Sequence, residues 1–341
     1  MFPSYSLELL LHPAGLQAKC KKSITMSIAI ATTVLNPAPN LDIWLDYHLQ
    51  RCAVIILYLD DPARRAIFEP FTNGRSVLLF DGAQDAPTMS PSNRLLVRQP
   101  SNLKHAISYL IEQQEQLGVD WLLHIDQDEI LFENGCTSWA TDPRVGHVTF
   151  INHEAVPLRH EPLNAFADCV WFNANGPDAE PFMAYGNGKS AVRLSRGVEP
   201  DGAHRFQKFQ GDAITLPDDA QAHQPYPVLL HYPYPSFESW RAKFSLYGHF
   251  SDFWMDDEQY PNRLDFMLQS RNKALAAMQA QESGDPGDPW SEARRFFEGR
   301  AFTGAELQKR IADGRVRRFT PFGEPQKVGE SAAEDDAMYT K

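Results

Sequence analysis

Short apolar runs alternate with polar and amphipathic stretches through the first part of the chain. Four of these runs have the length and apolar character of a buried β-strand. They cover residues 27–35, 53–59, 75–80 and 121–125. Between them, residues 41–51 have the apolar spacing of an amphipathic helix, which Asn40 would cap, and residues 94–117 give a longer helix. Strands that alternate with helices favour an α/β fold with a mostly parallel sheet and right-handed crossovers.

The pattern continues less regularly into the second half of the chain. One further strand is predicted at residues 146–151, and another apolar run ends at His231. Helical segments follow at residues 236–244, 263–282 and 290–312. The turn-rich residues 283–289 separate the last two segments. The polar, acidic residues 323–341 are expected to be disordered.

The composition of the chain is that of an ordinary globular protein. It has 341 residues, of which 43% are hydrophobic and 22% are charged. With 44 acidic against 32 basic residues, the net charge of −12 argues against a nucleic-acid-binding protein, which carries a basic surface. The four cysteines are widely spaced and match no zinc motif, so we expect them to be reduced.

No segment has the length of a transmembrane helix. The best candidate, residues 24–35, is about a dozen residues long, whereas a spanning helix needs roughly 20 apolar residues. Lysines precede this segment, but no cleavage site of a signal peptide follows it. We therefore expect residues 1–26 to be a peripheral extension. We expect the protein to be cytoplasmic, or to work against a membrane without crossing it.

Three carboxylates, Asp126, Asp128 and Glu129, directly follow the apolar run at residues 121–125. Ligands of open α/β sheets bind at the carboxyl ends of the strands. In an extended segment Asp126 and Asp128 project to the same side, where their like charges favour a divalent cation between them. The cation that suits oxygen ligands and bridges substrate phosphates is Mn²⁺ or Mg²⁺. The alternative is that the acids only end the strand and cap the next segment.

Several short motifs follow one another in a characteristic order. They lie at residues 31–36 (ATTVLN), 44–49 (WLDYHL), 58–61 (YLDD) and 124–129 (HIDQDE). In this order they resemble the GT-A-fold glycosyltransferases of the family 2 and family 92 type. The resemblance covers residues 27–135 well and rests beyond them on scattered pieces. It implies a GT-A-like nucleotide-binding domain at residues 27–250, with a mostly parallel mixed sheet flanked by helices, and a helical C-terminal extension at residues 251–322.

The resemblance implies a site for a nucleotide-sugar donor, with UDP as the leading nucleotide and Mn²⁺ or Mg²⁺ as the cofactor. Asp126 and Asp128 correspond to the paired aspartates that contact the metal and the ribose. Asp60 or Asp61 stands where relatives contact the uracil or the ribose. Capping of the helix that begins at the following proline explains an aspartate there equally well.

The remaining candidate residues are more widely separated. Lys189, in a glycine-flanked turn, would contact a phosphate, and the alternative is a plain hairpin turn with an exposed lysine. His231 is the better match, and His204 the competitor, for the histidine that completes the metal shell in relatives. Each would otherwise be a satisfied buried histidine. Inverting transfer needs a carboxylate that takes the acceptor's proton, for which Glu154 and Asp168 are candidates.

The expected function is metal-dependent transfer of a hexose, with inversion, from a nucleotide sugar to a glycan, lipid or protein acceptor of unknown identity. A haloacid-dehalogenase-like phosphatase is one alternative, with Asp126 as the nucleophile and Asp128 as the general acid. In that class, however, the motif normally lies on the first strand of the domain. A degenerate, non-catalytic sugar-binding relative is the other alternative, because it would show the same sequence features.

Overall fold

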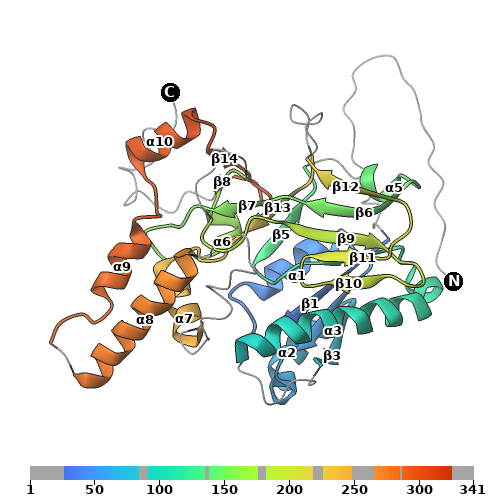
Figure 1. Ribbon diagram of the computed structural model, residues 1–341, viewed down its shortest axis with the longest axis horizontal. Coiled ribbons are helices and arrows are strands. Elements are labelled where there is room, and N and C mark those ends of the chain that lie inside the picture. Colours follow the sequence, from blue (N-terminus) through green and yellow to red (C-terminus); the bar gives the residue numbers. More distant parts are fainter. Residues whose placement is uncertain are drawn as a thin grey trace.

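Seven strands form the larger of two main β-sheets, in the order β12–β6–β9–β4–β1–β2–β3 (Figure 1). The computed structural model describes residues 27–83, 91–134, 138–175, 182–217, 226–247, 265–284 and 286–324. The predicted extension at residues 1–26 and nearly all of the predicted acidic tail lie outside these residues. The strands of this sheet are β1 (Ile28–Val34), β2 (Val54–Leu59), β3 (Val77–Asp81), β4 (Trp121–His124), β6 (Val145–Phe150), β9 (Lys189–Arg193) and β12 (Asp212–Leu216).

The predicted α/β fold with a mostly parallel sheet is confirmed. Strands β3, β2, β1 and β4 are parallel neighbours, and β12 is parallel to β6. Strand β9 is inserted between β4 and β6 and runs antiparallel to both, so the sheet is mixed. The helices of the first part of the chain are α1 (Leu41–Leu49), the 3₁₀ helix η1 (Pro62–Arg64), α2 (Arg65–Thr72), α3 (Pro91–Glu112) and α4 (Gln114–Leu117).

Strand β1 shows why helices cover both faces of this sheet. Ile28 and Ile30 point to the apolar cluster that contains the buried side chains of α1 and α2. Ala29 and Ala31 point to the opposite cluster, which contains the buried side chains of α3. Because side chains alternate along a strand, an uninterrupted apolar run serves both faces at once. The alanines lie on the α3 side, where a small side chain lets the long helix lie close to the sheet.

A second, five-stranded sheet has the order β14–β8–β7–β13–β5. Its strands are β5 (Glu129–Phe132), β7 (Asn152–Ala155), β8 (Trp171–Asn173), β13 (Val228–His231) and β14 (Val316–Arg318), and β10 (Glu199–Asp201) pairs separately with β11 (Arg205–Gln207). Ile130, Leu229 and Phe172 extend the apolar cluster of β1 into this sheet. The two sheets therefore share a core, and β4 leads directly from one sheet into β5 of the other.

Among the helices of the second half, α5 (Ser138–Thr141) packs against β6 of the first sheet, and the others lie on the side of the second sheet (Figure 1). These others are α6 (Ala165–Asp168), α7 (Phe237–Tyr247), α8 (Asp265–Ser283), α9 (Ser291–Glu298) and α10 (Gly304–Ala312). Helices α7, α8 and α9 pack around the fully buried Trp240, whose indole N–H donates to the Ser270 hydroxyl at 3.0 Å. Among the described helices, none combines the length and apolar character that crossing a bilayer requires.

Three predictions of local structure need correction. Asn40 precedes α1 with a left-handed backbone (φ 65°), and its side chain makes no capping hydrogen bond. The residues after β4 are not one extended segment, because the chain turns at Gln127 and Asp128 before β5 begins at Glu129. The predicted helical C-terminal extension also contains a strand, β14, which pairs with β8. Three residues are too few for a strand to show in the hydrophobic pattern.

Buried histidines predict a loss of stability in mild acid. His48 in α1 donates from Nδ1 to the carbonyl of Trp44 at 2.9 Å, and burial lowers its pKa from 6.5 to about 3. Between these two pH values the unfolded chain binds a proton that the folded protein excludes, so stability present above the higher value is lost as the pH falls. One such group contributes a slope of up to about 1.4 kcal/mol per pH unit.

We expect His48→Gln to flatten the dependence of the unfolding free energy on pH between 6.5 and 4.5, as measured by urea denaturation. The same change at the exposed His160 is the matched control and should leave the slope unchanged. A His48→Gln slope equal to that of the unmodified protein would show that His48 accepts its proton in the folded state.

Candidate functional site

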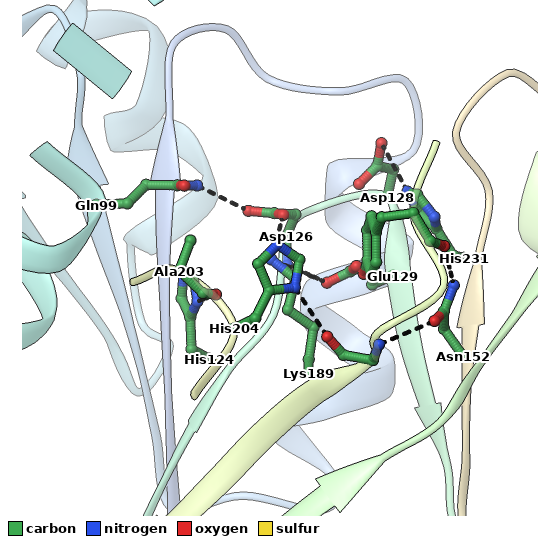
Figure 2. A network of polar contacts seen from close by, with 12 residues as sticks. Gln99, His124, Asp126, Asp128, Glu129, Asn152, Lys189, Ala203, His204 and His231 are labelled. Atoms are coloured by element: carbon green, nitrogen blue, oxygen red, sulfur yellow. Dashed lines mark hydrogen bonds and ion pairs between the residues drawn. The ribbon is translucent and has the colours of Figure 1, made fainter. Parts of the chain in front are cut away.

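The predicted acidic residues lie where the two sheets meet. Asp126 and Asp128 occupy the turn between β4 and β5, and Glu129 is the first residue of β5. The backbone N–H of Asp126 donates to Oε2 of Glu129 at 2.6 Å. The carbonyl of Asp128 accepts from the N–H of Tyr232 at 2.8 Å, just after β13. The turn is thus fixed from both sides, and it holds two carboxylates next to His204, His231 and Lys189 (Figure 2).

Lys189 is the counter-ion of this turn and is buried. Its Nζ lies 2.7 Å from Oδ2 of Asp126 and 4.0 Å from Oε2 of Glu129. Its side chain is 1% exposed, so the alternative of an exposed hairpin lysine is wrong. The ammonium is directed at Asp126. A contact between Lys189 and a phosphate therefore remains a prediction, and in that contact the ammonium would pair with Asp126 and the phosphate at once.

Burial and the charge of Lys189 shift the pKa values of Asp126 and Glu129 in opposite directions. Burial raises the pKa of Asp126, but the charge and hydrogen bond of Lys189 outweigh it and hold that pKa well below its usual range. Burial raises the pKa of Glu129 well above its usual range, although Lys189 lowers it in part. Burial also lowers the pKa of Lys189 itself, but Asp126 and Glu129 raise that pKa overall. Asp126 is therefore an anion at neutral pH, paired with a cationic lysine.

The glycine before Lys189 is explained by packing. Gly188 has φ +72°, and a Cβ atom there would lie 2.2 Å from the carbonyl oxygen of Phe150. Its N–H donates to the side-chain oxygen of Asn152 at 3.1 Å. The close approach of β9 to β6 thus requires a glycine at this position. The glycine-flanked turn is accounted for without a phosphate.

Asp128 lies between His231 and Lys243. Oδ2 of Asp128 is 3.9 Å from Nε2 of His231 and 3.0 Å from Nζ of Lys243. On its other side, Nδ1 of His231 lies 3.9 Å from Oε1 of the fully buried Glu154. Burial lowers the pKa of His231 to about 4, so its imidazole is neutral at pH 7. A neutral imidazole has a lone pair to offer to a metal ion.

The residues of this turn fit a divalent cation only if a substrate supplies further ligands. Among the described residues, no group of three His, Cys, Asp or Glu side chains is arranged to hold a metal ion. Asp128 and His231 offer one carboxylate and one imidazole, both partly or fully enclosed. Mg²⁺ and similar cations bind readily through one or two protein ligands when substrate phosphates and water complete the shell. The donor set therefore suits a cation that arrives together with a diphosphate.

His204 is close to Asp126 and Lys189 and is separated from His231 by an aromatic ring. The ring of Tyr185 lies 4.7 Å from both imidazoles, centre to centre. Nδ1 of His204 donates to the carbonyl of Gly188 at 2.8 Å, and burial with the nearby Lys189 lowers its pKa to about 3. A metal-binding role stays a prediction for both histidines, of which His231 is the one that lies close to Asp128.

Helix α3 adds polar residues that sequence patterns did not single out. Arg98 and Asp60 form an almost buried ion pair at 2.5 Å, at the end of β2. Gln99 donates from its amide to Oδ1 of Asp126 at 3.3 Å. Both residues lie inside a long predicted helix, where the sequence pattern places polar residues on the solvent-exposed face. The one available signal was the aspartate at the end of β2, which needs a positive partner.

Asp61 behaves as the capping alternative describes. Its Oδ1 accepts from the N–H of Ala63 at 3.1 Å, and Oδ2 accepts from Arg64 at 3.2 Å. Asp61 is thus the N-cap of η1, with Pro62 in the first position. Of the two adjacent aspartates, Asp60 is the one that the structure connects to α3 and hence to the turn after β4.

The two candidate bases are in different surroundings. Glu154 is fully buried in β7, and its carboxylate accepts from the N–H groups of Met183 and Ala184. Burial raises its pKa to about 7, although the two N–H groups lower it in part. Asp168 lies at the end of α6 and accepts from the N–H of Asn164 at 3.0 Å. Glu154 lies next to His231, and the contacts of Asp168 are those of a helix cap.

Comparisons with known proteins give partial matches. No family model matches the chain. Two proteins of Arabidopsis thaliana, both named glycosyltransferase-like, are 25% and 27% identical to it over 167 residues, which is 42% of this chain. The chain spans 30% and 35% of the length of these relatives, about a third.

One solved structure can be superposed on a large part of this chain. It is the mannose-1-phosphate geranyltransferase of Thermus thermophilus, which is 11% identical, with 80% of this chain and 68% of that chain covered. The TM-score is 0.24, which is too low to support an argument about fold or activity.

Proposed function

We propose that this protein is a glycosyltransferase that takes its sugar from a nucleotide sugar, with UDP as the nucleotide. The observation that carries the proposal is a pair of side chains: Asp128, in the turn that follows the central strand β4, and His231, at the end of β13, with 3.9 Å between Oδ2 and Nε2. Ligands of α/β sheets bind at this edge. The names of the two partial relatives support the same class of activity.

The proposed donor lies across the ends of β1, β2 and β4. The nucleoside would contact the Asp60–Arg98 pair and Gln99, because a hydrogen-bonded carboxylate, guanidinium and amide offer donors and acceptors for a base and a ribose. The diphosphate would lie beside Asp128 and His231. Bound there, Mn²⁺ or Mg²⁺ would offset the negative charge that develops on the leaving diphosphate.

The buried residues keep the two aspartates in place. Lys189 holds Asp126 as an anion, and Gln99 contacts the other oxygen of the same carboxylate. Both oxygens of Asp126 are therefore engaged, which suits a residue that positions a ribose or a metal-bound water better than a nucleophile. Asp128 is partly exposed, at 26%.

Glu154 is better placed to support His231 than to meet an acceptor. A carboxylate hydrogen-bonded to the second nitrogen of a metal-binding imidazole orients the ring, and Glu154 lies 3.9 Å from that nitrogen, beside it but beyond hydrogen-bond distance. Its two backbone N–H contacts and complete burial leave no open path to a sugar hydroxyl in this arrangement. Inversion, and a carboxylate base for it, belong to the proposal through the family resemblance.

The proposed activity is tested by the release of UDP from a set of UDP-sugars, including UDP-galactose, with and without Mn²⁺. We expect at least one UDP-sugar to be cleaved in the presence of Mn²⁺, and His231→Ala to reduce the rate by about 100-fold, as expected for a lost ligand of a catalytic metal. Hydrolysis of a simple phosphate monoester with no cleavage of any UDP-sugar would support the phosphatase alternative instead.

A further inference from the structure

Lys243 forms an ion pair with Asp128, the carboxylate to which the proposed function assigns a metal ion. It comes from α7, far along the chain, and its Nζ lies 3.0 Å from Oδ2 of Asp128. The same ammonium lies 5.1 Å from the centre of the Tyr234 ring. Its helix is anchored in the core by Trp240 and Phe244, both fully buried. The backbone of Lys243 is therefore fixed at the rim of the site, while its side chain is 29% exposed.

Lys243 and a divalent cation cannot both remain next to Asp128. Two like charges at such close range repel strongly at the effective dielectric constant of a partly buried site, and a divalent ion doubles the repulsion. Occupation of Asp128 by the metal would thus displace the ammonium. The partial exposure of Lys243 gives the side chain room to move, in contrast to Lys189, which is 1% exposed.

The donor diphosphate supplies the new partner for the displaced ammonium. It enters the same place with several negative charges, of which a single divalent ion neutralises only part. Ammonium groups pair strongly with phosphate oxygens as compact point charges. Because α7 is anchored, a short rotation of the side chain from Asp128 would keep Nζ next to whatever binds at Asp128 and His231.

We propose that Lys243 is the residue that contacts the diphosphate of the donor, and that its ion pair with Asp128 is the resting position of the same ammonium. This inference rests on the proposed function. In the transfer, the bond between the sugar carbon and the diphosphate oxygen breaks, and its electron pair stays on the diphosphate. The acceptor oxygen bonds to that carbon and gives its proton to solvent water. Lys243 then faces the newly negative oxygen.

The inference predicts that removal of the Lys243 ammonium affects the binding of Mn²⁺ and the binding of a diphosphate in opposite ways. Lys243→Met should leave Mn²⁺ binding to the protein unchanged or make it several-fold tighter, because a competing cation is removed. With Mn²⁺ saturating, the same variant should bind UDP and inorganic pyrophosphate at least about 10-fold more weakly, as expected for the loss of a charged hydrogen bond. Binding of uridine should not change.

Matched variants separate this role from a structural one. Lys273→Met removes an ammonium from the neighbouring helix α8, where it pairs with Glu292, and should leave all these affinities as they are. Lys243→Arg should retain most of the diphosphate affinity. Lys243→Gln provides a second neutral variant, and thermal unfolding of each variant shows that it is folded.

The measurements are Mn²⁺ binding by electron paramagnetic resonance and ligand binding by calorimetry. The inference is overturned if Lys243→Met binds UDP and pyrophosphate as tightly as the unmodified protein, or if it loses Mn²⁺ binding. Binding of pyrophosphate that depends on Lys243, without binding of UDP, would uphold the inference and reject the nucleotide-sugar function. If the unmodified protein binds neither ligand, both proposals fail.

Discussion

Replacement of Lys189 by methionine is expected to destabilise the protein by about 1–3 kcal/mol. Lys189 is 1% exposed and lies 2.7 Å from Asp126 and 4.0 Å from Glu129, which is fully buried. The side chain of Asp126 is 30% exposed, so removal of the ammonium leaves its charge without a partner but partly solvated. The pKa of Asp126, which Lys189 holds well below its usual range, should rise in the variant.

Urea denaturation of three proteins tests this expectation. Lys309→Met is the control, because Lys309 pairs with Asp313 on the surface of α10 and its side chain is 68% exposed. That variant should lose less than about 1 kcal/mol. The double variant Lys189→Met with Asp126→Asn should recover part of the lost stability, since the uncompensated charge is gone. A loss below about 1 kcal/mol for Lys189→Met alone would mean that Asp126 does not need this counter-ion.

Asp128→Asn should abolish metal-dependent binding of UDP while the fold stays intact. The change keeps the shape of the side chain and removes its charge, so the proposed cation loses its one carboxylate ligand. Changes to residues that merely support a metal ligand typically cost 10–100-fold in affinity, so the loss of the ligand itself should cost about 100-fold or more. Asp128 and Lys243 are both partly exposed, so their ion pair adds little to stability.

The matched control for this variant is Asp46→Asn. Asp46 is 61% exposed and pairs with Arg75 at 3.1 Å, on the outside of α1. It should bind UDP and Mn²⁺ as the unmodified protein does. Equal affinities for Asp128→Asn and Asp46→Asn would remove Asp128 from the donor site. A large fall in the melting temperature of Asp128→Asn would instead assign it a structural role.

The parts of the fold with a strong local signal could be predicted from sequence. Strands β1, β2, β3 and β4 and helices α1 and α3 follow patterns with clear boundaries, and they place the acidic turn at the edge of the sheet, whereas α2 was not predicted. The sequence did not show that β4 and β5 belong to different sheets. The apolar residues of β5 follow those of β4 after a short polar interruption, so a single long strand and two separate strands would have the same hydrophobic pattern.

The candidate site was predictable in its acids and less so in its cations. Asp126, Asp128 and His231 stand out because carboxylates or an imidazole end an apolar run. Lys189 was predicted to contact a phosphate, with an exposed hairpin lysine as the alternative. Neither prediction included a buried acid as its partner, because the burial of Glu129 is a property of the tertiary structure alone. Arg98 and Lys243 extend into the site from helices. Their spacing along those helices predicts solvent-exposed positions, so the sequence did not indicate that they belong to the site.

The most direct test of the donor site is the binding of UDP to the unmodified protein, measured by calorimetry with and without Mn²⁺. The account predicts binding that requires Mn²⁺ and that Asp128→Asn loses. Absence of UDP binding in the presence of Mn²⁺ would contradict it.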